Sequence, residues 1–269
     1  MLYLAFIALF LVLWGCFYAV LPALRRGEAL AAWLFARLTY ASRLKPYVPL
    51  VLILVIGGLA IAWAGDQFVD LAELVRAKNP KLQDVDVLAH AWAISKRTAS
   101  DTSFFVLMSN IGSPVGMTAI AAIVALVLAI TKRFRWMFYL IITAGGGALI
   151  NMELKRYFAR ARPDIAEMLL RASGYSFPSG HAMGSTVVLC ALSYLAARTA
   201  TRWRWKAACL ALAWTLILSI ALSRVYLGVH WISDVAAGIC IGGLWVALTT
   251  VSYETARRIR LLRTGRVSG

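Results

Sequence analysis

Long apolar runs separated by short polar segments dominate this chain. A helix needs about 17 to 25 mostly apolar residues to cross a bilayer, because its backbone polar groups must all be satisfied within the segment. Seven runs meet this requirement, and we predict an all-α, polytopic membrane protein. The predicted spans are residues 2–24, 48–64, 115–130, 136–152, 182–197, 207–222 and 235–251.

The longest interruption, residues 65–114, mixes acidic residues with apolar positions at helical spacing. This pattern predicts one or two amphipathic helices lying on the outer surface. His90 lies in this segment, and we predict that it is a surface residue.

Composition and charge agree with the membrane assignment. The chain is 61% hydrophobic, a balance that excludes a soluble domain. The net charge of +16 suggests nucleic acid as a partner, but the cations cluster in short loops between apolar runs, which argues against it. More than half of the Lys and Arg residues fall on one side of the seven-span topology, which the positive-inside rule makes cytoplasmic, so the amino terminus is predicted outside. These are Arg25, Arg26, Arg37, Arg43, Lys45, Lys132, Arg133, Arg135, Arg198, Arg202, Arg204, Lys206, Arg257, Arg258, Arg260, Arg263 and Arg266.

Several residues inside or beside the spans have simple interpretations. The first run has no basic residue before it and is predicted to be a retained anchor. The four cysteines lie within predicted spans, and we infer neither disulfides nor a metal site; nothing calls for a cofactor. Residues 145–147, three glycines, allow close packing of helices or close approach of a lipid chain. The residues treated as interfacial anchors are Trp136, Trp203, Trp205 and Trp231.

Three segments on the predicted outer side contain residues suited to phosphate chemistry. In the first, Lys155 and Arg162 are seven residues apart, so a continuing helix would place both on one face. Pro163 is predicted to end that helix at Arg162, which leaves the guanidinium free to bind a phosphate. Taken alone, the segment also fits a basic helix next to the membrane.

In the second segment, Ser179 is a good N-cap for the span that follows. Gly180 allows the backbone to approach an oxyanion, and the helix start offers free amides and a positive dipole. His181 would then lie within reach of a bound phosphate and could protonate a leaving group. The alternative is an interfacial histidine without a catalytic role.

In the third segment, His230 and Asp234 are four residues apart, so the carboxylate can accept a hydrogen bond from the imidazole within one helical turn. That bond would fix the tautomer and leave the other ring nitrogen free to attack phosphorus. Arg224 would stabilise the developing charge. For this pair alone, simple capping of the last span is the alternative.

Together, Lys155-x6-Arg162-Pro163, Pro178-Ser179-Gly180-His181 and Ser223-Arg224-x5-His230-x3-Asp234 resemble the three-part signature of the type 2 phosphatidic acid phosphatase (PAP2) superfamily, in its membrane-bound lipid phosphatase branch. The resemblance implies a six-helix core, to which residues 2–24 add an extra span. It divides the chain into an anchor and basic loop (residues 1–46), a phosphatase domain (47–253) and a basic tail (254–269).

The resemblance also implies metal-independent removal of phosphate through a phosphohistidine. His230 is the expected nucleophile, Asp234 orients it and His181 protonates the leaving group. The expected phosphate ligands are Lys155, Arg162, Ser179, Gly180 and Arg224. A bacterial inner membrane with the site on its outer face follows as the expected location.

The expected partners are a lipid phosphate and the surrounding membrane lipids. Undecaprenyl diphosphate, phosphatidylglycerophosphate and phosphatidic acid are the leading substrates, with lipid A phosphates a further possibility. A phosphotransferase of the same family would use the same histidine. A vanadate-dependent haloperoxidase has a similar signature but resembles soluble proteins, and a non-catalytic scaffold or transporter would not need the motifs.

Overall fold

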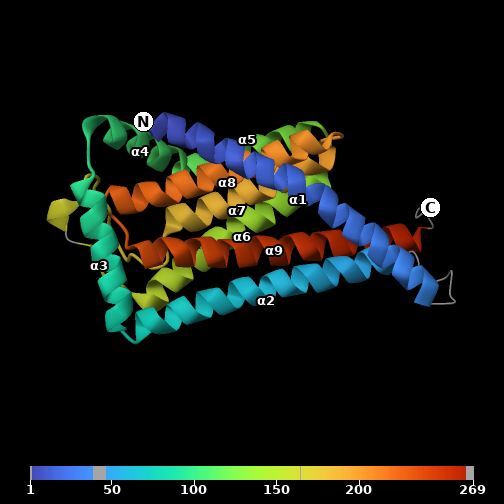
Figure 1. The fold of residues 1–269 in the computed structure, drawn as a ribbon, viewed down its shortest axis with the longest axis horizontal. Helices are drawn as coiled ribbons and strands as arrows, with labels where there is room; N and C mark the ends of the chain where they lie inside the picture. Colours follow the sequence, from blue (N-terminus) through green and yellow to red (C-terminus); the bar gives the residue numbers. More distant parts are fainter. Residues whose placement is uncertain (1, 39–46, 164, 265–269) are drawn as a thin grey trace.

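The computed structural model describes residues 2–38, 47–163 and 165–264, which form a bundle of long helices without a strand (Figure 1). The basic residues Arg43, Lys45 and Arg266, the predicted boundary between residues 46 and 47 and the end of the predicted tail lie outside the described residues. The helices are α1 Leu2–Leu38, α2 Val48–Arg76, α3 Pro80–Ser95, α4 Ala99–Ile111, α5 Pro114–Ile130, α6 Phe134–Phe158, α7 Gly180–Thr199, α8 Trp203–Tyr226 and α9 Ile232–Arg263, with a short 3-10 turn, η2, at Ile165–Glu167.

The prediction of a polytopic all-α protein is confirmed. Among the described residues, six helices are long and apolar enough to cross a membrane, namely α1, α2, α6, α7, α8 and α9. The predicted span 115–130 corresponds to α5, which meets α4 at a 50° bend and counts as a seventh span only together with α4. The helices are longer than the apolar runs because helix-forming polar residues extend them.

α3 lies across one end of the bundle (Figure 1). It begins where the Asn79 side chain accepts hydrogen bonds from the amides of Lys81 and Leu82, with Pro80 at the first helical position. One or two helices were predicted within residues 65–114, and the structure has two, α3 and α4, while residues 65–76 continue α2.

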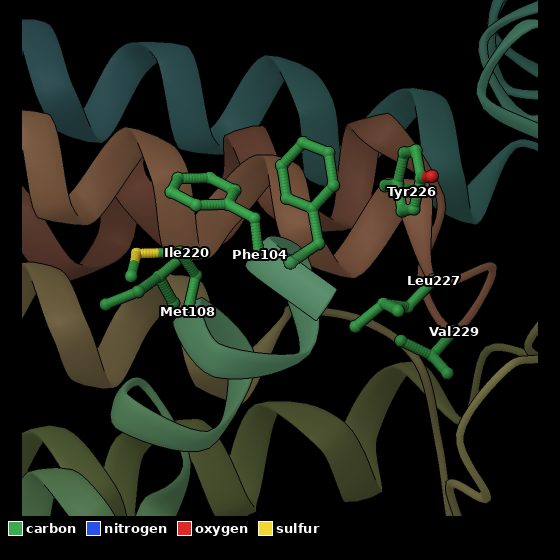
Figure 2. Packing of buried hydrophobic residues seen from close by; sticks show 7 residues of the cluster. Phe104, Met108, Ile220, Tyr226, Leu227 and Val229 are labelled. Carbon is green, nitrogen blue, oxygen red and sulfur yellow. The ribbon is translucent and has the colours of Figure 1, made fainter. Parts of the chain in front are cut away.

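α4 supports the end of α8 and the loop that follows it. Figure 2 shows Phe104 and Met108 of α4 beside Ile220 of α8, with Leu227 and Val229 further along the chain. Leu227 and Val229 are fully buried, and burial of such side chains stabilises by about 1.5 to 3 kcal/mol each. The cluster therefore holds in place the loop that leads to His230.

Glycines permit the closest helix contacts. A Cβ at Gly238 of α9 would lie 2.8 Å from the Ser179 carbonyl oxygen, so only glycine allows α9 to approach the start of α7 this closely. Gly146 and Gly147 of α6 pack against Trp245 and Val187, which supports the helix-packing interpretation of this glycine run.

Candidate active site

The structure brings the three predicted segments together at the end of the bundle covered by α3. The Ser179 amide donates a hydrogen bond to the Asp234 carbonyl oxygen at 2.9 Å, which joins the second segment to the third. Arg162 Nη1 lies 3.2 Å from His230 Nε2, which joins the first to the third. A Cβ built on Gly180 would lie 3.8 Å from Lys155 Cε, so the first two segments are also adjacent.

His230 is buried and contacts a different partner through each ring nitrogen. Its Nδ1 lies 3.3 Å from Asp234 Oδ2, a long hydrogen bond, and its Nε2 faces a guanidinium N–H of Arg162. Because a carboxylate only accepts and a guanidinium only donates, the contacts assign the proton to Nδ1 and the lone pair to Nε2. The predicted relation of His230 to Asp234 is present, but it spans the start of α9 rather than a turn within it.

Burial sets the protonation state of His230. Removal from solvent lowers the pKa of His230 to about 4, and the positive charges of Arg162 and Lys155 act in the same direction. The hydrogen bond and negative charge of Asp234 raise the pKa but do not offset the burial. At neutral pH the ring is therefore uncharged, and its Nε2 has the lone pair that a nucleophile needs.

Lys155 and Arg162 do lie together, but the predicted helical route between them is wrong. α6 ends at Phe158, and Ala159 adopts a left-handed conformation with φ of 44°, so the chain turns before Arg162. The two cations meet at one backbone atom, since Lys155 Nζ and Arg162 Nη2 lie 2.6 and 3.3 Å from the Tyr175 carbonyl oxygen.

The remaining contacts of Arg162 are also to main-chain carbonyls. It donates to Gly174 from Nε, to Ser173 from Nη2 and to Val229 from Nη1, at 3.0, 3.1 and 2.7 Å. Burial lowers the pKa of Arg162, and the charge of Asp234 partly opposes this, yet the guanidinium stays cationic at neutral pH. The carbonyls hold the guanidinium without neutralising it.

Arg224 approaches the site from α8 and is 5% exposed. Its Nη1 donates to the Ser109 hydroxyl of α4, and its Nε has no hydrogen-bond partner among the described residues. The Arg224 carbonyl oxygen accepts from the His230 amide at 3.3 Å, so this residue also positions the histidine backbone. A buried cation with an unused donor is suited to binding an anion.

His181 lies in the first turn of α7, which begins at the N-cap Ser179 as predicted. The Ser179 side chain accepts from the Ala182 amide at 3.5 Å, the limit of a hydrogen bond. His181 lies within electrostatic range of His230 and of the three cations Arg224, Arg162 and Lys155. The structure thus places both histidines in one cationic environment.

A network of paired charges behind His230 was not predicted. Arg160 donates to Asp234 Oδ1 and the Ser233 hydroxyl, both at 2.7 Å, and to Asp86 Oδ2 of α3 at 2.6 Å. Asp86 also accepts from the Ser233 amide at 3.0 Å and from its hydroxyl at 2.7 Å. Sequence reasoning missed this network because Asp86 and Arg160 are far apart along the chain; the only signal was a carboxylate between Val85 and Val87.

The prediction that His90 is a surface residue is wrong. His90 is 7% exposed, and its Nε2 lies 2.9 Å from Glu167 Oε2 of η2. Its ring is 5.5 Å from that of Trp231, which in turn donates from Nε1 to the Ala161 carbonyl oxygen. His90 is buried because α3 lies across the end of the bundle, which brings this face of the helix against the site loops.

A cavity of about 720 Å³ opens beside these residues. Its walls come from the end of α2, the first turns of α3 and the segment that follows α6. Arg160, Arg162 and Trp231 line it, so Trp231, expected to be an interfacial anchor, lies at the mouth of the site. Neither histidine lines the cavity, and we regard it as the approach to the site rather than the site itself.

Comparison with known proteins agrees with this arrangement. The sequence profile of the PAP2 superfamily matches residues 135–258, which include all three segments. These residues belong to the PAP2 superfamily. A crystal structure of a transmembrane PAP2-type phosphatidylglycerolphosphate phosphatase from Bacillus subtilis superposes with a TM-score of 0.66 at 23% identity, covering 72% of this chain and 96% of that one, so the fold is shared.

Two relatives of this chain have names that state an activity. Phosphatidylglycerophosphatase B of Bacillus subtilis is 34% identical over 122 residues, 45% of this chain and 60% of its own length. An undecaprenyl-diphosphatase of Sulfolobus acidocaldarius is 31% identical over 143 residues, 51% of this chain and 65% of its own length. The chain therefore spans less than two thirds of each. These relatives are PAP2 phosphatases of lipid phosphates.

Proposed function

We propose that this protein is an integral-membrane phosphatase that hydrolyses a lipid phosphomonoester or diphosphate through a phosphohistidine on His230. The relatives support phosphatase activity, and the geometry around His230 supports the mechanism. Phosphotransfer to a second lipid would use the same first step, and analysis of the product distinguishes the two.

One observation carries the proposal: a neutral, oriented imidazole lies among three cations that have no carboxylate partner in the described residues. Lys155 and Arg162 are held by carbonyl oxygens, and Arg224 by a hydroxyl. Their combined positive charge is uncompensated, so it favours a multiply charged anion such as a phosphate group. Fixed cations of this kind stabilise charge that develops during phosphoryl transfer.

The chemistry proceeds in two steps. His230 Nε2 forms a bond to phosphorus while the bond from phosphorus to the lipid oxygen breaks, and His181 gives its proton to that oxygen. Water then attacks phosphorus, His181 takes the proton of the water, and the electron pair of the P–N bond returns to Nε2. Asp234 stabilises the charged imidazole between the two steps.

For the substrate, we propose a lipid whose headgroup enters through the cavity beside Arg160 and Arg162. The side chains of Asn79 and Gln83 line this cavity, and their amides suit a polar headgroup. Undecaprenyl diphosphate, phosphatidylglycerophosphate and phosphatidic acid are the substrates to compare. The distribution of cations supports placing the site on the outer face of a bacterial inner membrane.

The test is phosphate release by purified protein in detergent, with EDTA present, from each of the three lipids. His230→Ala is expected to abolish release, whereas Arg156→Gln, a control at an exposed residue of α6, is expected to retain it. A radiolabelled phosphate that is stable to alkali and lost in acid should remain on the wild-type protein after rapid quenching. Undiminished release by His230→Ala would overturn the mechanism.

The role of His181 is tested by changing the leaving group. His181→Ala should lower the rate with a lipid alkoxide by about 10²- to 10⁴-fold, because general acid catalysis is lost. With p-nitrophenyl phosphate, whose phenolate leaves without a proton, the loss should be much smaller. An equal loss with both substrates would assign His181 to binding instead.

A further inference from the structure

A second group of cations lies at the opposite end of α6, roughly 35 Å along the helix axis from the candidate active site. The turn between α5 and α6 contains Lys132, in a left-handed conformation, and Arg133, and the first turn of α6 adds Arg135. The end of α9 contributes Arg257 and Arg260. These five cations line a cavity of about 740 Å³, together with Trp136 and Tyr253.

The cavity continues into an apolar groove between α6 and α9. The groove has a volume of about 470 Å³ and shares Arg135, Tyr253 and Arg260 with the basic cavity. Phe138, Ile142 and Leu248 line it, and each is more than two-fifths exposed. Trp245 closes its far end, where the indole donates to the Thr143 carbonyl oxygen at 2.8 Å.

The charges in this cavity are largely uncompensated. Glu254 is buried nearby and pairs with Arg257 at 2.7 Å, and also with Arg198 and the Tyr194 hydroxyl. Within the part of the chain that the structure describes, the other cations of the cavity have no carboxylate within ion-pair distance. They are Lys132, Arg133, Arg135 and Arg260.

We propose that this continuous pocket binds an anionic diacyl phospholipid of the leaflet opposite to the active site. Its headgroup phosphate would lie between Arg135 and Arg260, and one acyl chain would occupy the α6–α9 groove. Basic pockets between membrane helices bind acidic headgroups in this way. Loop charges that only orient a protein in the membrane need no apolar extension, whereas a lipid needs both parts.

Native mass spectrometry of the purified protein in detergent tests the proposal, with phosphatidylglycerol as the probe. Arg135→Gln combined with Arg260→Gln should weaken binding by about 30-fold. The matched control is Arg202→Gln with Arg204→Gln, which removes the same charge at the same end of the bundle, outside both cavities, and should bind as the wild type does. Zwitterionic phosphatidylethanolamine should bind the wild type more weakly.

Two further measurements separate a lipid from a free anion. Leu248→Trp fills the groove and should weaken phosphatidylglycerol binding, whereas Leu212→Trp, on the exposed face of α8, should not. Glycerol phosphate should fail to compete. Equal loss in both arginine pairs, unchanged binding by Leu248→Trp, or full competition by glycerol phosphate would overturn the proposal, and none of these readouts depends on phosphatase activity.

Discussion

Two groups of charges meet at His230, and they differ in how they are compensated. On one side Lys155, Arg162 and Arg224 are held by carbonyl and hydroxyl oxygens. On the other side Arg160 lies between the carboxylates of Asp86 and Asp234. Arg160 and Arg162 are only two residues apart, yet one is neutralised and the other is not.

The difference separates a cation that stabilises the structure from cations that are available to bind an anion. A cation paired with carboxylates adds little to the field at the site, but it fixes the elements that carry its partners, here α3, the loop after α6 and the start of α9. A cation held by neutral acceptors keeps its full charge for an incoming anion. Removing one from each group should therefore damage different properties.

The largest effect is expected from Arg160→Met. This change leaves Asp86 and Asp234 buried without their partner, and loss of one member of a buried ion pair typically costs about 3 to 5 kcal/mol. The thermal unfolding midpoint in detergent should fall by about 10 °C. A double variant, Arg160→Met with Asp86→Leu, should recover part of this loss, and absence of recovery would mean that Arg160 does not act through Asp86.

Arg162→Gln should show the opposite behaviour. It removes charge that no carboxylate balances, so kcat should fall by about 10²- to 10³-fold, or about 2.7 to 4 kcal/mol in the barrier, if it behaves like a lost oxyanion donor. The unfolding midpoint should fall less than in Arg160→Met, since no buried carboxylate is left without its partner. Arg156→Gln is the matched control, since Arg156 is exposed and, among the described residues, forms its ion pair with Glu153. An equal loss of activity in both variants would remove the special role of Arg162.

The smallest effect concerns pH. Because the pKa of His230 is about 4 and its neutral form is the proposed nucleophile, kcat/KM should hold as the pH falls from about 7 to about 5 and then decline. Samples returned to neutral pH before assay control for denaturation. An acidic limb near about 6.5, the value of an exposed histidine, would contradict the buried nucleophile.

Much of the fold was predictable because crossing a membrane imposes long apolar helices. Helix ends were less predictable. α6 stops at Phe158 although Ala159 is a good helix former, since Arg160 turns toward Asp86 and its carbonyl accepts from the Ser176 amide. The position of this helix end depends on residues that are distant in the sequence, so no local sequence pattern predicts it.

The site residues were easier to find than the contacts that support them. His230, His181 and the three cations belong to motifs that can be read from spacing, and the structure places them together. Arg160 and Asp86 belong to no such motif. His90 lies in a segment whose composition is typical of a surface helix. Only the position of α3 across the bundle explains why Asp86 and His90 are buried.

The carbonyl contacts of Arg162 have a consequence for how such a protein can diversify. Ser173, Gly174 and Tyr175 bind this arginine through main-chain oxygens, which every amino acid possesses. Side chains in this loop can therefore change without loss of the contacts that hold Arg162, provided that Gly174 keeps its positive φ. Related proteins could therefore differ in these loop side chains, and in the headgroup that is bound there, while the proposed reaction at His230 stays the same.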